Sequence, residues 1–78
     1  MRVLIADDEP AARRKLSRML GAFAFIDIVA EASDGDAALQ LICEHQPDVA
    51  FLDIEMPEMT GIEVAQRAAA SNVHIVFV

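Results

Sequence analysis

Short apolar runs along the chain alternate with stretches in which apolar residues recur at helical spacing. Four runs, each bounded by charged or turn-forming residues, predict strands at Val3–Ala6, Ile26–Glu31, Val49–Asp53 and Val73–Val78. A short apolar run between such breakers is typical of a strand that is buried on both faces. The second run is the least apolar, so we expect it at an edge of the sheet.

The segments between these runs predict helices at Pro10–Leu20, Asp36–His45 and Gly61–Ala70. Pro10 suits the first turn of a helix, where its missing N–H leaves no bond unmade. Pro47 ends the second helix, because the residue before a proline avoids helical backbone angles. Strands and helices that alternate through short connections predict an α/β domain. Its sheet would be parallel, with helices on both faces and right-handed crossovers.

The composition limits the class of protein. The chain has 78 residues, 55% of them hydrophobic, which allows one small domain with a thin core. Its net charge of −7 disfavours direct nucleic-acid binding, which needs a basic surface. No run reaches the ~18 uncharged apolar residues of a membrane span, and acids interrupt the first run too early for a signal peptide. The lone Cys43 fits a reducing, cytoplasmic setting, and we expect it to be a small buried hydrophobe.

Acidic residues follow two of the predicted strands. Asp7 and Asp8 come directly after the first strand, and Asp53 ends the third. If these strands are neighbours, the acids meet at the carboxyl edge of the sheet, where open α/β folds place their chemistry. Unit charges ~4 Å apart repel by ~4 kcal/mol at an effective dielectric constant of ~20, so a cation is expected between them. Oxygen ligands with room for water suit Mg²⁺, and the third acid can then attack a phosphoryl group. Each acid alone also fits an ordinary helix or turn cap.

Two segments carry a resemblance to a known family. VLIADDEP and, further on, PDVAFLDIEMPEMTGIEV are similar to the receiver domain of two-component response regulators, and the resemblance covers the whole chain. It implies a flavodoxin-like, doubly wound parallel sheet with the strand order two–one–three–four. It also implies a signalling function, in which a phosphohistidine of a histidine kinase gives its phosphoryl group to this domain with the help of Mg²⁺.

The resemblance implies a role for each residue of the site. Asp53 would accept the phosphoryl group and contact the metal. Asp8 would bind Mg²⁺ directly, Asp7 would bind it largely through water, and Glu55 would offer its backbone carbonyl. A receiver accepts a phosphoryl group and aids its own phosphorylation and dephosphorylation, so we do not expect a turnover enzyme. The segment DDEPAAR also resembles receivers that are joined to LytTR-type DNA-binding domains.

The chain departs from the family pattern at its C-terminal end. Receivers have five strands, whereas the fourth predicted strand reaches Val78, so we expect an incomplete sheet, one truncated receiver domain over residues 1–78 and no output domain. The family's Ser or Thr after the fourth strand and its Lys after the fifth would be missing, and phosphoryl switching would be impaired. The fourth strand would form a bare apolar edge, which predicts a homo-oligomer through this strand or through exchange of elements.

Two other functions are also compatible with the sequence. The chain would be an inert, self-associating interaction fragment if the site no longer switches. A haloacid-dehalogenase-like phosphatase is suggested by Asp53-Ile54-Glu55, which faintly resembles an acid-x-acid nucleophile motif, but no later acidic motif supports it. The basic run Arg13–Arg18 is interpreted as a solvated helix face, with docking of a histidine kinase as the alternative.

Overall fold

The chain is described from a computed structural model that covers all residues, 1–78. Strands and helices alternate along it as the sequence pattern predicts. Their bounds are β1 (Arg2–Ala6), α1 (Pro10–Gly21), β2 (Asp27–Ala32), α2 (Gly35–His45), β3 (Val49–Leu52), α3 (Gly61–Arg67) and β4 (His74–Phe77). None of the helices has both the length and the apolar character that a membrane span requires.

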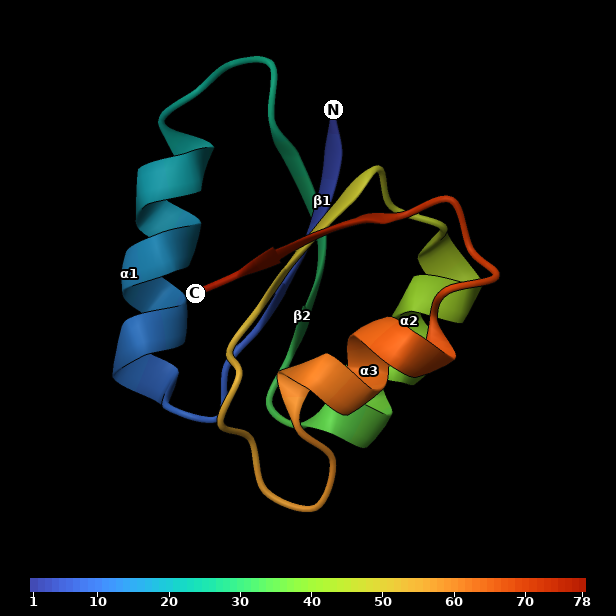
Figure 1. Ribbon diagram of the computed structural model, residues 1–78. Helices are drawn as coiled ribbons and strands as arrows, with labels where there is room; N and C mark the ends of the chain where they lie inside the picture. Colours follow the sequence, from blue (N-terminus) through green and yellow to red (C-terminus); the bar gives the residue numbers. More distant parts are fainter.

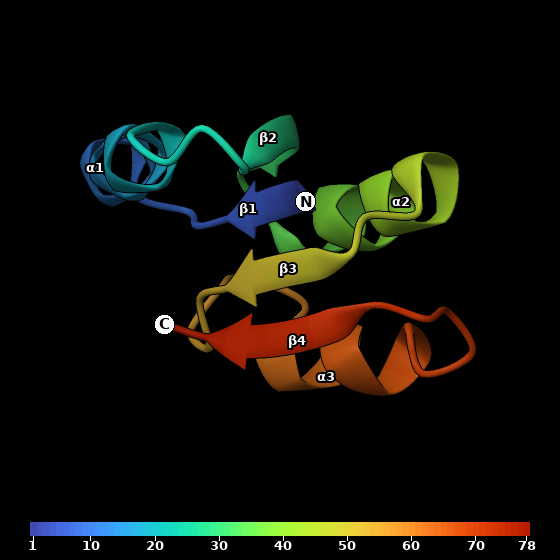
Figure 2. The same ribbon diagram turned by 90° about the horizontal axis from the view of Figure 1, so that it is seen from above.

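The strands form one parallel sheet in the order β2-β1-β3-β4. Figure 2 shows β1, β3 and β4 side by side with their arrows pointing the same way. Helix α1 lies on one face of the sheet, and α2 and α3 lie on the other (Figure 1). The fold class, the strand order and the edge position of β2 are therefore confirmed.

The main core lies between the sheet and the helices α2 and α3. Alternate residues of β1 and β3 point into it, because side chains along a strand alternate between its two faces. The buried members of this core include Leu4, Ala6, Ala38, Ile42, Ala50, Leu52 and Val64. Ile42 and Val64 bring α2 and α3 onto this face, and neither side chain reaches solvent.

Two of the three helices begin at side-chain caps. An oxygen of Asp34 accepts the N–H of Ala37 at 2.8 Å, and the hydroxyl oxygen of Thr60 accepts the N–H of Glu63 at 3.2 Å. Such caps satisfy N–H groups that the first turn of a helix leaves without partners. Helix α1 instead starts on Pro10, as predicted.

The face on the α1 side is only partly covered. Val3 and Ile5 of β1 are fully buried there, but no residue of α1 is buried. Beyond them the same face continues over β3 and β4 without a helix above it. We call this surface the open face and define it by Val49, Phe51, Val76 and Val78, the last two of which are 41% and 52% exposed.

Three details of the sequence prediction are wrong. The third helix ends at Arg67 rather than Ala70, because bonds from Ala69 N–H to Gln66 and from Ser71 N–H to Ala68 tighten the chain into turns. The first helix includes Gly21 and is capped by Ala22. Cys43 is exposed rather than buried, since it lies on the side of α2 away from the sheet.

Candidate functional site

The parallel pairing of β1 and β3 sets the position of the site. Ala6 and Leu52 are partners at the ends of these strands, so Asp7 and Asp53 leave the sheet side by side. The N–H of Asp53 donates to the carbonyl of Ala6 at 2.9 Å, which continues the ladder by one bond. On the other side, the N–H of Asp7 donates to the carbonyl of Ala32 at 3.1 Å. The backbone of both acids is therefore fixed by the sheet.

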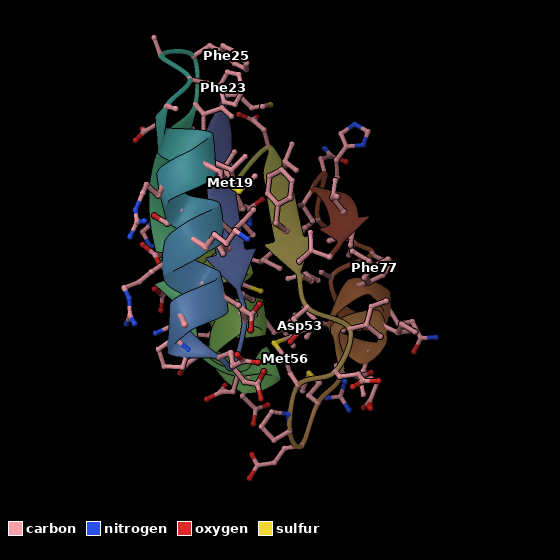
Figure 3. The ribbon with its side chains drawn as sticks, turned by 90° about the vertical axis from the view of Figure 1, so that its left-hand side faces the viewer. Met19, Phe23, Phe25, Asp53, Met56 and Phe77 are labelled. Atoms are coloured by element: carbon pink, nitrogen blue, oxygen red, sulfur yellow. The ribbon has the colours of Figure 1, made fainter.

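The structure brings the three predicted acids together. Asp7, Asp8 and Asp53 each place one carboxylate oxygen within 4.8 Å of the others. Asp7 and Asp53 are half-buried, whereas Asp8 is exposed, so the acidic cluster is open to solvent on one side. Figure 3 shows Asp53 at the end of β3, with Met56 beside it in the loop that follows.

Backbone N–H groups orient two of the carboxylates. The N–H of Glu9 donates to Oδ1 of Asp7 at 2.9 Å, and the N–H of Glu55 donates to Oδ1 of Asp53 at 3.2 Å. Each bond spans two residues and forms an Asx turn, so the acids that end the strands also shape the loops after them. The side chain of Glu55 is exposed, and only its backbone takes part in these contacts.

The surroundings of Asp53 raise the pKa of its carboxyl group above the ordinary value of 3.8. Burial of the carboxyl group is the largest cause, and the neighbouring Asp7 and Asp8 add to it through their negative charge. The N–H of Glu55 opposes the rise because it donates to the ionised form. The surroundings of Asp53 therefore disfavour its ionised form.

The loop between β3 and α3 is held against the core on both sides of its exposed tip. Met56 and Met59 are 4% and 8% exposed and pack in the main core. Between them Glu58 adopts a positive φ of 68°, and the N–H of Met59 donates to the carbonyl of Pro57 at 2.7 Å. The loop thus turns sharply while both of its methionines stay buried.

Gly61 allows α3 to begin directly against Asp53. A Cβ atom at this position would collide with the backbone carbonyl of Asp53 and with Cα of Ile54. The N–H of Gly61 donates to the carbonyl of Ile54 at 3.0 Å, so the two backbone segments are hydrogen-bonded as well as in close contact. Only glycine, which has no Cβ, fits this approach without moving the residue that carries the central carboxylate.

The sequence interpretation does not identify one residue near the site. It places Arg13 in a solvated basic run, but the side chain of Arg13 is only 21% exposed and its Nη1 donates to the backbone carbonyl of Asp7 at 2.8 Å. Arg14, Lys15 and Arg18 are exposed as expected. The helical spacing of the sequence could have indicated that Arg13 is partly buried, since Arg13 lies on the same face of α1 as the apolar Leu16 and Leu20.

A shallow groove of ≈ 240 Å³ runs from Asp7 along α1 to the end of the chain. It is lined mainly by apolar side chains, which are Ala12, Leu16, Met19 and Val78, together with Asp7 and Lys15. The groove is the boundary between α1 and the open face, and it adjoins the acidic cluster only at Asp7.

The model of the family described as the response regulator receiver domain matches residues 3–78 of this chain. The chain belongs to the response regulator receiver domain family. Among its curated relatives, a response regulatory protein of Vibrio cholerae is 54% identical over 65 residues, which are 82% of this chain and 25% of the relative. A protein-glutamate methylesterase/protein-glutamine glutaminase of Haloarcula marismortui is 42% identical over 72 residues, 92% of this chain and 19% of the relative. The chain thus spans a quarter or less of these relatives, and relatives of this receiver domain include enzymes.

Solved receiver domains share the fold over nearly the whole chain. The signal receiver domain of the response regulator NarL from Mycobacterium tuberculosis superposes with a TM-score of 0.94 at 40% identity, covering 97% of this chain and 63% of that one. The CheX–CheY complex with BeF₃ and Mg²⁺ from Borrelia burgdorferi matches with a TM-score of 0.89 at 27% identity, covering 99% of this chain and 60% of that one. The arrangement of β1 and β3 is thus that of a receiver.

Proposed function

We propose that this chain is the phospho-acceptor module of a two-component signalling system and that Asp53 receives the phosphoryl group. The observation that carries the proposal is the convergence of three carboxylate oxygens within 4.8 Å at the carboxyl edge of β1 and β3. Membership of the receiver family supports it, as does the similar CheY, whose structure was solved with BeF₃ and Mg²⁺. The phosphoryl donor would be a phosphohistidine of a histidine kinase.

The acidic cluster fits a hard divalent cation. Its donors are carboxylate oxygens. The pKa of Asp53 is raised first by burial and then by the neighbouring negative charges of Asp7 and Asp8, which a cation would neutralise. Asp7, Asp8, Asp53 and the backbone carbonyl of Glu55 would hold Mg²⁺, with water completing the ligand set. When bound, the ion would offset the charge of both the acids and the incoming phosphoryl oxygens.

The transfer itself needs one nucleophile from this chain. A carboxylate oxygen of Asp53 attacks phosphorus, a P–O bond forms, and the P–N bond to the imidazole of the donor breaks. The imidazole keeps the electron pair of that bond. The N–H of Glu55 holds one oxygen of Asp53 in place, and the close approach of Gly61 fixes the backbone behind it.

We further propose that a polypeptide of these 78 residues binds the metal but responds weakly to phosphorylation. The acids that gather the cation all lie on β1, β3 and the loops after them, within the fold described above. A polypeptide extended through a fifth strand is the appropriate comparison. Equal phosphorylation and an equal structural response in the two polypeptides would show that residues 1–78 suffice.

A titration with Mg²⁺ and beryllofluoride tests the site directly. We expect Mg²⁺-dependent capture of beryllofluoride, followed by ¹⁹F NMR, which Asp53→Asn abolishes. The matched control is Glu58→Gln, which removes one negative charge from the exposed tip of the same loop and should leave capture intact. Absence of both metal binding and capture would instead favour an inert interaction fragment. Sustained phosphate release from small phosphoesters would favour a phosphatase.

We also propose that a second copy of this chain covers β4. The outer edge of β4 has no neighbouring strand in the sheet, so its backbone N–H and C=O groups are available to another extended strand. Val76, Phe77 and Val78 are 41%, 43% and 52% exposed, so the edge is apolar as well as unpaired. Two such edges complement each other, because each offers the same backbone groups and the same apolar side chains.

A further inference from the structure

Arg13 links the loop that carries two acids of the cluster to the edge strand of the sheet. Its Nη1 donates to the backbone carbonyl of Asp7 at 2.8 Å, and its Nε lies 3.8 Å from Oε1 of Glu31 on β2. We propose that Arg13 is a positioning residue that holds the acidic cluster in its metal-binding geometry. The inference rests on the proposed function of the cluster, and it assigns a role to a residue outside the ligand set.

The contact acts on the peptide unit between two of the proposed ligands. The carbonyl of Asp7 belongs to the planar peptide group that joins Asp7 to Asp8, so fixing the carbonyl also fixes the direction in which the chain enters Asp8. The N–H of Asp7 is held by Ala32, and its Oδ1 is held by the N–H of Glu9. With Arg13 in place, every hydrogen-bonding group of the Asp7 backbone has a partner.

The position of Arg13 on the helix makes this contact possible. Only Asp8 and Glu9 separate Asp7 from the start of α1, and Arg13 lies one turn into the helix, where its N–H bonds to the carbonyl of Glu9. The guanidinium therefore reaches back over the loop between β1 and α1. The strand already fixes one end of this loop, and the helix fixes the other. A loop that is held at both ends, and whose first peptide group is also held by Arg13, loses little further freedom when the metal binds.

The positive charge of Arg13 is balanced at its other end. A fixed cation beside the cluster would by itself oppose binding of a metal ion, but Glu31 pairs with it, and the hydroxyl of Ser17 donates weakly to Glu31 at 3.5 Å. Arg13 therefore contributes geometry more than charge. Its planar guanidinium can contact the carbonyl of Asp7 and the carboxylate of Glu31 at the same time. A lysine ammonium at this site would make the two contacts less well.

The test compares two arginine variants with the same loss of charge. Arg13→Gln removes the contact, whereas Arg14→Gln removes an exposed arginine from the next position of the helix. Mg²⁺ affinity is measured by ¹H–¹⁵N chemical-shift titration. We expect Arg13→Gln to weaken it about tenfold, the lower end of the effect of outer-shell partners on metal affinity. Arg14→Gln should leave the affinity unchanged or slightly stronger, and Arg13→Lys should restore it only in part.

Hydrogen exchange without metal provides a second readout. The amides of Asp7 and Glu9 should exchange faster in Arg13→Gln, while those of Leu4 and Ala50 keep their rates. Equal Mg²⁺ affinities of the two Gln variants would overturn the inference, and so would faster exchange at all four amides alike. If the unaltered chain binds no Mg²⁺, the proposed function fails. The exchange rates at Asp7 and Glu9 then still decide whether Arg13 holds the loop.

Discussion

The position of Asp53 in the fold disfavours the ionised form of its carboxyl group. The sheet fixes its backbone and half-buries its side chain, while Asp7 and Asp8 bring negative charge close to it. These conditions raise its pKa, so the folded chain carries an ionised group that its surroundings disfavour. A cation placed between these acids would offset the unfavourable charge.

The first residue-scale prediction concerns Asp53→Asn without metal. Because the native pKa lies above the value of 3.8 in the unfolded chain, ionisation of Asp53 lowers stability as pH rises through the native pKa. We expect Asp53→Asn to increase the free energy of unfolding at pH 7, by up to about 1 kcal/mol, the size of partly screened charge interactions. Urea denaturation should show the gain shrinking as pH falls towards 3.8. Glu58→Gln, with the same change of charge at an exposed side chain, is the matched control. Destabilisation by Asp53→Asn at pH 7 would contradict the account.

The second residue-scale prediction concerns the glycine behind Asp53. Gly61→Ala would press a methyl group into the backbone of Asp53 and Ile54, so we expect a loss of about 1–3 kcal/mol in unfolding free energy and weaker capture of beryllofluoride. Gly21→Ala is the matched control. A Cβ there meets nothing within 4 Å, and alanine favours the helix by up to about 1 kcal/mol. Equal effects of the two substitutions would show that the contact at Gly61 is unimportant.

At the scale of elements, the three helices are held unequally. Helix α2 packs against β1, β2 and α3 and buries Ala38 and Ile42 completely, whereas α1 rests on β1 and β2 and buries no residue. The difference follows from the number of neighbours, since α2 has another helix beside it and α1 has the open face. We therefore infer that α1, which carries Arg13, opens more readily than α2.

Native-state hydrogen exchange measures this difference without a substitution. Amides in the middle of α2 should exchange roughly tenfold more slowly than those in the middle of α1, which corresponds to ~1.4 kcal/mol in the free energy of local opening. Helix α3 is short and is expected to resemble α1. Equal protection of α1 and α2 would mean that the whole chain opens as one cooperative unit.

At the scale of the whole molecule, the accessible surface area is ordinary, but the exposed apolar side chains are unevenly distributed over it. The accessible area is 4583 Å², close to the roughly 4,700 Å² expected for a folded chain of this mass. Exposed apolar side chains gather along β4 and the open face, and a second group forms at the far end of α1. There the rings of Phe23 and Phe25 lie 5.6 Å apart, at the end of the molecule opposite Asp53 (Figure 3).

Self-association through β4 is the prediction at this scale. Light scattering should show a dimer whose share grows with protein concentration. It should also grow with salt, because a net charge of −7 per chain opposes the contact until it is screened. Val76→Lys places a charge on the edge strand and should give a monomer. Ile62→Lys alters a similarly exposed apolar residue on α3 and should not. If the unaltered chain is a monomer at high micromolar concentration, the proposed self-association through β4 is wrong.

The sequence determined the local structure and the identity of the acids. Apolar runs between breakers located four strands, and Pro10 marked the start of a helix, because such signals act between residues near each other in the chain. Resemblance to the receiver family supplied the strand order, which the local pattern alone left open. The tertiary structure decided the rest. The register of β1 against β3 set the distances between the acids, and the packing of α1 against β2 turned Arg13 from a surface charge into a partner of Asp7. It also left Cys43 exposed and α1 without a buried residue, because burial depends on which elements meet in space.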